Sequence, residues 1–184
     1  MFYTVDDARD VSVRLSRTES FSVEESLLKH SDIGREYDVF LSHSFADRRV
    51  LHGVIRIIES QGVSVYVDWR DDPLLERQHV TATTAERLRQ RMHRCRALIF
   101  ATSETSSKSV WMPWELGYFD GRKAGRVAVM PLTKRPNDIW DGQEYLGLYP
   151  VVERHALGGH VHIVSKSNSQ ARWSSVRSMA GHRP

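Results

Sequence analysis

The sequence predicts a doubly wound α/β domain, and three observations lead to that prediction. From residue 37 onward, short apolar runs alternate with amphipathic helical stretches, which is the pattern of βαβ units. The 184-residue chain is long enough for one domain with a substantial core and hardly for two. Right-handed crossovers then place helices on both faces of a parallel sheet. We therefore expect a domain over about residues 36–165, after a helical extension at 1–35.

The elements follow in order along the chain. The polar first 35 residues predict helices at 5–15 and 23–30, the second with Ser22 as a cap. An apolar run at 37–41 predicts a buried strand, and helical spacing predicts a helix at 46–61 that Gly62 ends. The remaining expected elements are a strand at 63–67, a loop at 68–79, a helix at 83–93, a strand at 97–101, a helix at 113–123, a strand at 126–132, a loop at 133–147, weaker strands at 149–154 and 160–164, and a flexible basic tail at 166–184.

Composition limits the classes of function. Lys and Arg number 26 against 23 Asp and Glu, and a net charge of +3 is too small to indicate nucleic-acid binding. The single cysteine, Cys95, excludes an internal disulfide and fits a reducing compartment. No apolar run approaches the roughly 18 residues of a membrane span, and the N-terminus lacks the regions of a signal peptide. We expect a cytoplasmic protein with no membrane or nucleic-acid partner.

Polar residues follow three of the predicted strands. In a doubly wound sheet, ligands bind at the carboxyl ends of the strands, where the winding reverses. The residues at that edge are Ser42, His43 and Ser44 after the first strand, Asp68 and Trp69 after the second, and Thr102 and Ser103 after the third. His43 has two readings here, as a base or as a histidine hydrogen-bonded at a strand end.

A carboxylate, Glu115, stands among aromatic residues near the start of a predicted helix. Pro113 suits a first helical turn, so Glu115 is expected beside the end of the third strand. Trp111, Glu115 and Tyr118 share one helical face by their spacing, and Trp114 lies between them in the sequence. The neighbouring face, assigned to the core, carries Met112, Leu116 and Phe119. Spacing alone leaves two roles for Glu115: it complements the helix dipole, or it is the active group.

Other constellations are weaker. The chain has no phosphate-binding glycine loop and no nucleophile elbow. His160 and His162 would share a strand face, but no third ligand is indicated, so we expect no metal site. Arginines lie around the predicted helix at 83–93: Arg87, Arg89, Arg91, Arg94 and Arg96. We interpret them as a solvated face, because no aromatic stacking platform accompanies them.

Three segments together resemble Toll/interleukin-1 receptor (TIR) domains. Residues 37–44, Tyr-Asp-Val-Phe-Leu-Ser-His-Ser, resemble the first TIR box, and 65–69 with the Pro73 loop resemble the second strand and BB loop. Residues 109–116, Ser-Val-Trp-Met-Pro-Trp-Glu-Leu, resemble the segment that carries the glutamate of catalytic TIR domains. The resemblance covers about residues 36–155 in register. It is nearest to the bacterial group that includes the TIR proteins of Thoeris anti-phage defence.

The resemblance implies a flavodoxin-like sheet of about five strands and cleavage of the nicotinamide–ribose bond of NAD. Glu115 takes the position of the catalytic glutamate, and the loop at 68–78 covers the nicotinamide end. Met112 stands where many relatives have cysteine; because it falls on the proposed core face, we expect no loss of chemistry. NAD is then a substrate, with no cofactor. The product is ADP-ribose or a cyclic or modified form of it, which activates a partner effector.

The chemistry agrees with a single carboxylate. Nicotinamide leaves from a positive pyridinium and becomes neutral, so no acid need protonate it, in contrast to ordinary glycosidases. An ionised Glu115 can stabilise the ribosyl oxocarbenium. Rings able to stack and exclude water are Trp69, Trp111, Trp114 and Tyr118. Two alternatives stand beside the enzyme: a non-catalytic TIR module that self-associates through its surfaces, and a regulator that senses a nucleotide. Glu115 favours the enzyme.

Overall fold

A computed structural model of the chain describes residues 1–16, 34–44, 47–72, 75, 80–104, 106, 109–140, 142–154, 161–167 and 170–182. The predicted helix at 23–30 and Pro73 lie outside these residues. Within the described ranges, every helix falls short of the length and apolar character that a bilayer crossing requires.

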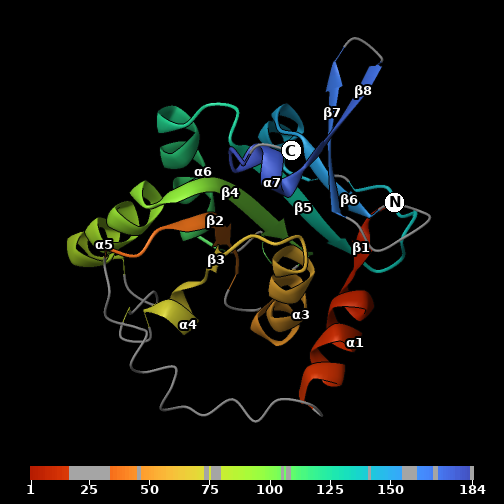
Figure 1. The fold of residues 1–184 in the computed structure, drawn as a ribbon, viewed down its shortest axis with the longest axis horizontal. Helices are drawn as coiled ribbons and strands as arrows, with labels where there is room; N and C mark the ends of the chain where they lie inside the picture. Colours follow the sequence, from red (N-terminus) through yellow and green to blue (C-terminus); the bar gives the residue numbers. More distant parts are fainter. Residues whose placement is uncertain are drawn as a thin grey trace.

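The centre of the fold is a parallel sheet of five strands (Figure 1). These strands are β2 (Tyr37–Ser42), β3 (Val65–Tyr66), β4 (Cys95–Thr102), β5 (Val127–Thr133) and β6 (Val151–Arg154). Their order is β3-β2-β4-β5-β6, with every neighbouring pair parallel. This is the flavodoxin-like order, which reverses its winding between β2 and β4. The predicted fold class is therefore confirmed, and the crevice is expected at the carboxyl ends of these two strands.

Three further strands extend this sheet to eight, more than the five expected. β1 (Tyr3–Thr4) pairs in parallel with β5. β7 (Val161–Ser167) and β8 (Gln170–Ser175) continue the sheet antiparallel beyond β6 and stand out from the body in Figure 1. β7 confirms the weaker strand expected at 160–164. β1 and β8 were not predicted, because short runs with little apolar alternation give no strand signal.

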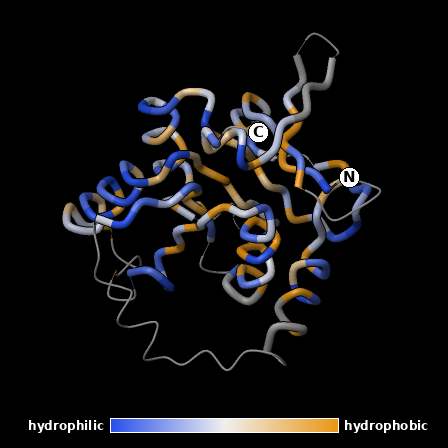
Figure 2. The backbone as a smooth tube through the Cα atoms, in the orientation of Figure 1, coloured by the Kyte–Doolittle hydropathy of each residue, from blue (hydrophilic) through white to orange (hydrophobic). Residues whose placement is uncertain are grey.

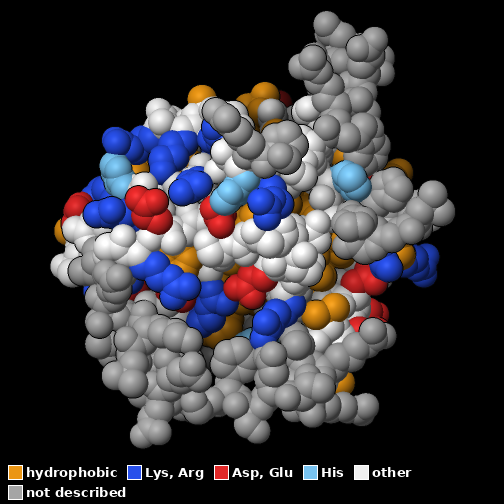
Figure 3. All heavy atoms as spheres, in the orientation of Figure 1, with side chains coloured by type: hydrophobic (Ala, Val, Ile, Leu, Met, Phe, Trp, Pro, Cys, Tyr) orange, Lys and Arg blue, Asp and Glu red, His pale blue; other side chains and the backbone are white. Residues whose placement is uncertain are grey.

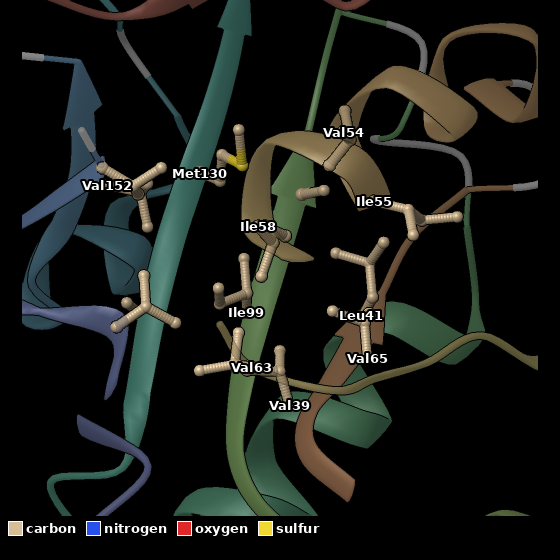
Figure 4. Packing of buried hydrophobic residues seen from close by; sticks show 14 of the residues in the cluster. Val39, Leu41, Val54, Ile55, Ile58, Val63, Val65, Ile99, Met130 and Val152 are labelled. Carbon is tan, nitrogen blue, oxygen red and sulfur yellow. The ribbon is translucent and has the colours of Figure 1, made fainter. Parts of the chain in front are cut away.

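Helices cover both faces of the sheet. On one face, α1 (Val5–Ser16), α3 (Arg48–Glu59) and α7 (Val176–Met179) contribute to a cluster of buried aliphatic residues. Figure 4 shows α3 residues such as Ile58 packed over Val39 and Ile99 of the sheet. On the other face lie α5 (Ala82–His93), α6 (Trp111–Arg122) and η3 (Glu144–Leu148), with a more aromatic core. The hydrophobic colour in Figure 2 accordingly concentrates on the central strands.

The N-terminal helix belongs to the domain. α1 confirms the helix expected at 5–15 and packs beside α3 (Figure 1). At the contact, a Cβ added to Gly53 would lie 1.7 Å from the carbonyl oxygen of Ala8. The two backbones therefore approach as closely as only glycine permits.

The C-terminal segment differs from the flexible tail expected at 166–184. Residues 170–175 form β8, and α7 follows at once. The Ser175 hydroxyl accepts from the Ser178 backbone N–H over 3.0 Å, which caps α7, and Val176 and Met179 enter the aliphatic core. Beyond α7, His182 Nε2 lies 2.7 Å from Asp38 Oδ1. The serine-rich composition predicted a tail, although Val176 and Met179 have the i, i+3 spacing of a helix and Ser175 is its cap.

The structure also differs from the prediction at the start of the loop expected at 68–79. Residues Asp68–Asp71 form a single helical turn, α4, directly after β3. The Asp71 carboxylate accepts from the Val67 backbone N–H over 2.7 Å and so closes the turn. The other predicted helices and strands agree with the structure to within a few residues at their ends, except that β3 is shorter than expected.

Candidate functional site

Glu115 and Ser42 meet at the point where the winding of the sheet reverses. Ser42 is the last residue of β2, and its hydroxyl donates to Glu115 Oε2 over 2.6 Å. Both side chains have no exposed surface. A buried carboxylate is costly unless it receives hydrogen bonds, and a hydroxyl donor to a charged acceptor makes a strong one. The fold therefore holds one carboxylate in a defined orientation at the carboxyl end of β2, the edge at which the sequence predicts the site.

Glu115 lies in the middle of the buried face of α6. Successive helical residues are about 100° apart, so Glu115 falls between Trp111 on one side and Met112 and Phe119 on the other. All four are buried. The expected division into a core face and a separate crevice face is therefore not what forms, because Glu115 shares the face that packs on the sheet.

Trp114 and Tyr118 lie on the flank of α6, against α5. Their rings stack with centroids 5.6 Å apart, and Arg89 lies 5.5 Å above the Trp114 ring. The Tyr118 hydroxyl is 2.9 Å from His93 Nε2. Burial, followed by the charge of Arg122, lowers the pKa of His93. The structure thus leaves these two rings, expected to bind substrate, outside the group formed by Glu115 and Ser42.

His43 connects the end of β2 to the loop after β3. Its Nδ1 is 2.9 Å from the carbonyl oxygen of Leu41, and its Nε2 is 3.2 Å from Asp68 Oδ1. Each ring nitrogen faces an acceptor, so the imidazole can donate to one of them in either tautomer. Both side chains are buried. This geometry is that of a histidine fixed at a strand end, the second of the two readings of the sequence.

Trp69 and Ser44 complete the residues expected at this edge. Trp69 follows Asp68, and its ring lies 4.8 Å from that of His52 on α3. It packs against the aliphatic core, on the opposite face from α6. Ser44 is buried directly after His43. Of the predicted site residues, the structure thus brings Ser42, His43, Ser44, Asp68, Trp111 and Glu115 to one end of the sheet.

A third carboxylate, Asp72, fixes the start of the loop to α5. Arg91 donates to it twice, from Nε to Oδ2 over 2.6 Å and from its terminal nitrogen to Oδ1 over 2.8 Å. The Tyr66 hydroxyl donates to the same carboxylate over 2.8 Å. Burial opposes the charge of Arg91, but the hydrogen bonds and charge of Asp72 outweigh it and raise the pKa of Arg91. Burial, and next the charge of Asp72, raises the pKa of Tyr66.

The Arg91–Asp72 pair corrects the interpretation of the arginines as a solvated face. Arg91 is 1% exposed. A signal was present in the sequence, because Arg91 follows Leu88 by three residues and so falls on the apolar face of the helix. Other arginines of this group are half-exposed, and Figure 3 shows basic side chains interspersed with acidic ones on the face in view.

Hydroxyl residues at the end of β4 and directly after it form a separate polar group. The Ser103 hydroxyl donates to the Asp47 carboxylate over 2.8 Å, and the Thr102 and Ser106 hydroxyls are 2.7 Å apart. Asp47 stands just before α3, so this group joins the segment between β2 and α3 to the segment after β4. Among the described residues, no three His, Cys, Asp or Glu side chains gather closely enough to hold a metal ion. His160 lies outside them.

Comparison with known proteins finds two similar to this chain. A probable 3′ cyclic ADP-D-ribose synthase, ThsB′ of Bacillus cereus, is 51% identical over 134 residues, which cover 72% of this chain and 69% of that protein. A putative cyclic ADP-D-ribose synthase, TIR2 of Cytobacillus dafuensis, is 33% identical over 92 residues, half of this chain and 24% of that protein. No family model matches the chain.

Proposed function

Because this chain belongs to the bacterial TIR family that includes ThsB′, we propose that it cleaves the nicotinamide–ribose bond of NAD and closes ADP-ribose into a cyclic nucleotide. Both relatives are named as cyclic ADP-D-ribose synthases. NAD is the substrate in this proposal, and no further cofactor takes part.

The observation that carries the proposal is the Ser42–Glu115 hydrogen bond at the carboxyl edge of the sheet. It supplies a single oriented carboxylate, and cleavage of NAD requires no second catalytic acid. When the C1′–N bond breaks, the electron pair stays on nicotinamide, which leaves as a neutral molecule. The positive charge that develops on the ribose is stabilised by the Glu115 carboxylate.

Glu115 also suits the closing step. A nucleophile of the adenosine half attacks C1′ of the same ribose from within the folded-back substrate. If this nucleophile is a ribose hydroxyl, its oxygen forms the new bond and its proton passes to the Glu115 carboxylate. Water attacking instead would give open ADP-ribose. A dry chamber therefore favours cyclisation, and the buried Trp111 ring beside Glu115 helps to keep it dry.

We infer a closed form of this site from the burial of its carboxylate. Glu115 has no exposed surface, so a ribose reaches it only after neighbouring side chains move. The loop that begins at Asp68 is anchored at both ends of its first turn, through His43 and Arg91. In our proposal, self-association through TIR surfaces opens the chamber, and the released cyclic nucleotide activates a separate effector.

The test incubates the purified protein with NAD, at low concentration and under crowding that promotes assembly, and identifies products by mass. We expect free nicotinamide and a product with the mass of NAD minus nicotinamide, the value for a cyclic ADP-ribose. Open ADP-ribose is heavier by one water. Absence of nicotinamide release under every condition would refute the enzyme and favour the non-catalytic TIR module.

A further inference from the structure

The positive charge of the chain gathers at the edge of the sheet opposite Glu115, the edge where β2, β4 and β5 begin. The described residues place seven exposed or partly exposed cationic side chains there: Arg35, Arg94, Arg96, Arg122, Lys123, Arg126 and Arg177. Three carboxylates stand against them: Glu36, Asp38 and Asp120. The last turn of α3 adds one charge of each sign, on Arg56 and Glu59. The difference of +4 exceeds the net charge of +3 of the entire chain.

Two of the carboxylates hold part of this basic surface together. Glu36, just before β2, lies 4.0 Å from Arg94 Nη1 and 3.8 Å from Arg96 Nη2. Asp38 of β2 lies 4.0 Å from Arg96 Nε and 2.7 Å from His182 Nε2. These contacts place the end of α5, the first residues of β4 and the segment after α7 side by side. The side chains of Arg94 and Arg96 remain 50% exposed, so both guanidinium groups face solvent.

Three further cations of the surface contact backbone carbonyl groups. Lys123 Nζ donates to two carbonyl oxygens at the end of α5, over 3.0 and 3.3 Å. Arg126 donates to the last carbonyl of α7, and Arg177 donates to the Gly62 carbonyl over 3.3 Å. Cations suit the C-terminal ends of helices, which explains where these side chains lie. A carbonyl is neutral, however, and in the described part of the chain none of these three, nor Arg122, has a carboxylate within 4.0 Å.

The surface offers charge without apolar anchors. The large hydrophobic side chains exposed in the described ranges lie elsewhere: Met1, Val13, Val80, Val110, Ile139 and Leu148. The core of a protein–protein interface is apolar and depleted of charge, and helices that lie on membranes insert apolar side chains. A phosphate backbone needs only cations, because the release of its counterions drives binding. Six of the seven cations are arginines, whose guanidinium fork matches phosphate oxygens.

The neighbouring aromatic rings favour a duplex over a single strand. Trp114 and Tyr118 precede Arg122 on α6 and stack on each other with centroids 5.6 Å apart. Arg89 lies 5.5 Å from the centre of the Trp114 ring, and Arg122 lies 5.9 Å from that of Tyr118. Proteins that bind single strands stack the bases on open aromatic faces, and these rings already stack with each other and with arginines. A duplex keeps its bases stacked inside and presents its phosphates.

We propose that this basic surface binds the phosphate backbone of double-stranded nucleic acid and reads no sequence. The small net charge of the chain gave no indication of such a partner, but its concentration at one edge of the sheet does. Figure 3 shows Lys and Arg side chains close together between α5 and the C-terminus on the face in view. Because the surface lies at the edge opposite Ser42 and Glu115, a bound duplex leaves that site accessible. The proposal therefore does not rest on the proposed function.

The test measures binding of a fluorescent DNA duplex of about 30 base pairs to the full chain by anisotropy, between about 50 and 200 mM NaCl. We expect the affinity to fall with salt, with a log–log slope of about −3 to −6, as several phosphate contacts require. Arg94→Gln, Arg96→Gln and Arg122→Gln together should weaken binding at least about tenfold and reduce the slope by about 2–3. Replacing the same three arginines by lysine should retain most of the affinity, because the charge is kept.

The matched control removes three positive charges elsewhere on the chain. Arg9→Gln, Arg89→Gln and Lys134→Gln together change the net charge equally, but each of these cations has a carboxylate within 3.2 Å. The affinity of this control for the duplex should therefore fall less than about threefold. Melting temperatures show that both triple variants fold, and Glu115→Gln should bind the duplex as the parent chain does.

Four outcomes overturn the proposal. The parent chain fails to bind the duplex at low salt, the two triple variants lose equal affinity, or a single strand of the same length binds more tightly than the duplex. The fourth is saturation by phosphatidylserine vesicles or polyglutamate at lower concentrations than by the duplex, which would assign the surface to a membrane or to an acidic protein.

Discussion

Ser42 on β2 and Glu115 on α6 stand 73 positions apart in the chain, and a 2.6 Å hydrogen bond joins them. The bond spans the first strand of the parallel sheet and the helix after β4, so it forms only when the doubly wound fold is complete. It fixes the carboxylate where the winding reverses.

Ser42→Ala tests that bond directly. Because the change leaves a buried carboxylate short of a donor, we expect a loss of about 1.5–3 kcal/mol in the free energy of unfolding. We also expect kcat for NAD cleavage to fall about tenfold or more, since the carboxylate is no longer held in place. Urea denaturation and nicotinamide release measure the two effects. Ser60→Ala, at the exposed end of α3, should change neither; an unchanged kcat in Ser42→Ala would contradict the positioning role.

Arg91→Ala tests the anchor of the loop. It removes the two close charged donors of the buried Asp72 carboxylate and leaves it only the Tyr66 hydroxyl and the more distant Arg87, so the free energy of unfolding should fall by up to about 3–5 kcal/mol. Adding Asp72→Asn should recover part of that loss, because the stranded charge is removed. Arg87→Ala is the matched control, since Arg87 is 3.7 Å from Asp72 but one-third exposed, and should cost at most about 1 kcal/mol. Equal losses from Arg91 and Arg87 in urea titrations would argue against the anchor.

Tyr118→Phe tests whether a residue on the flank of α6 contributes to substrate binding. The lost hydroxyl contacts His93 on the surface, so stability should change by no more than about 1 kcal/mol and the KM for NAD should stay within about twofold. Steady-state kinetics decides this. A large rise in KM would restore Tyr118 to the substrate-binding group that helical spacing first suggested.

Asp38 gives the fold a predictable pH dependence. Burial raises its pKa, but hydrogen bonds from the Ser64 backbone and hydroxyl and from His182 outweigh it, so the pKa is lowered. The resulting stability is present above the unfolded pKa of about 3.9 and is lost as the pH falls through the lower folded value. Asp38→Asn should therefore destabilise the protein by about 1 kcal/mol at pH 7, with the difference shrinking below about pH 4. Urea titrations across this range test it, and a difference that grows on acidification would reverse the sign.

Gly53→Ala tests the docking of α1. The new Cβ would overlap the Ala8 carbonyl, so we expect a loss of about 1–3 kcal/mol and faster proteolysis within the first 16 residues. Gly121→Ala in α6, where a Cβ meets nothing within 4 Å, should instead stabilise by up to about 1 kcal/mol. If both variants behaved alike in thermal melts, the close contact between α1 and α3 would not exist.

The alternation of strands and helices was enough to predict the fold class, because the spacing of apolar residues within each segment indicates which side of that segment is buried. The same holds for Glu115 at the sheet edge, where Pro113 marks the start of the helix. Pairings between distant segments carry no such pattern. Nothing in the sequence joins Ser42 to Glu115 or Arg91 to Asp72, because each pair depends on how two elements pack.

The prediction from composition was wrong at the C-terminus. Ser and Arg predicted a tail, but Val176 and Met179 bury their side chains and β8 pairs with β7. Spacing likewise placed Tyr118 with Glu115, but a helix lying on a sheet buries an arc of its surface, and Tyr118 falls at the edge of that arc. Only the packing decides which residues of a face are inside.

The measurement that bears most directly on the central claim compares the parent chain with Glu115→Gln in NAD turnover. Glutamine keeps the shape and can still accept from Ser42, so the variant should melt at a similar temperature. We predict that nicotinamide release and the cyclic product both fall about a hundredfold or more, while Glu86→Gln on the exposed side of α5 stays at the parent rate. Turnover in Glu115→Gln equal to that of the parent would contradict the assignment of Glu115 as the catalytic carboxylate.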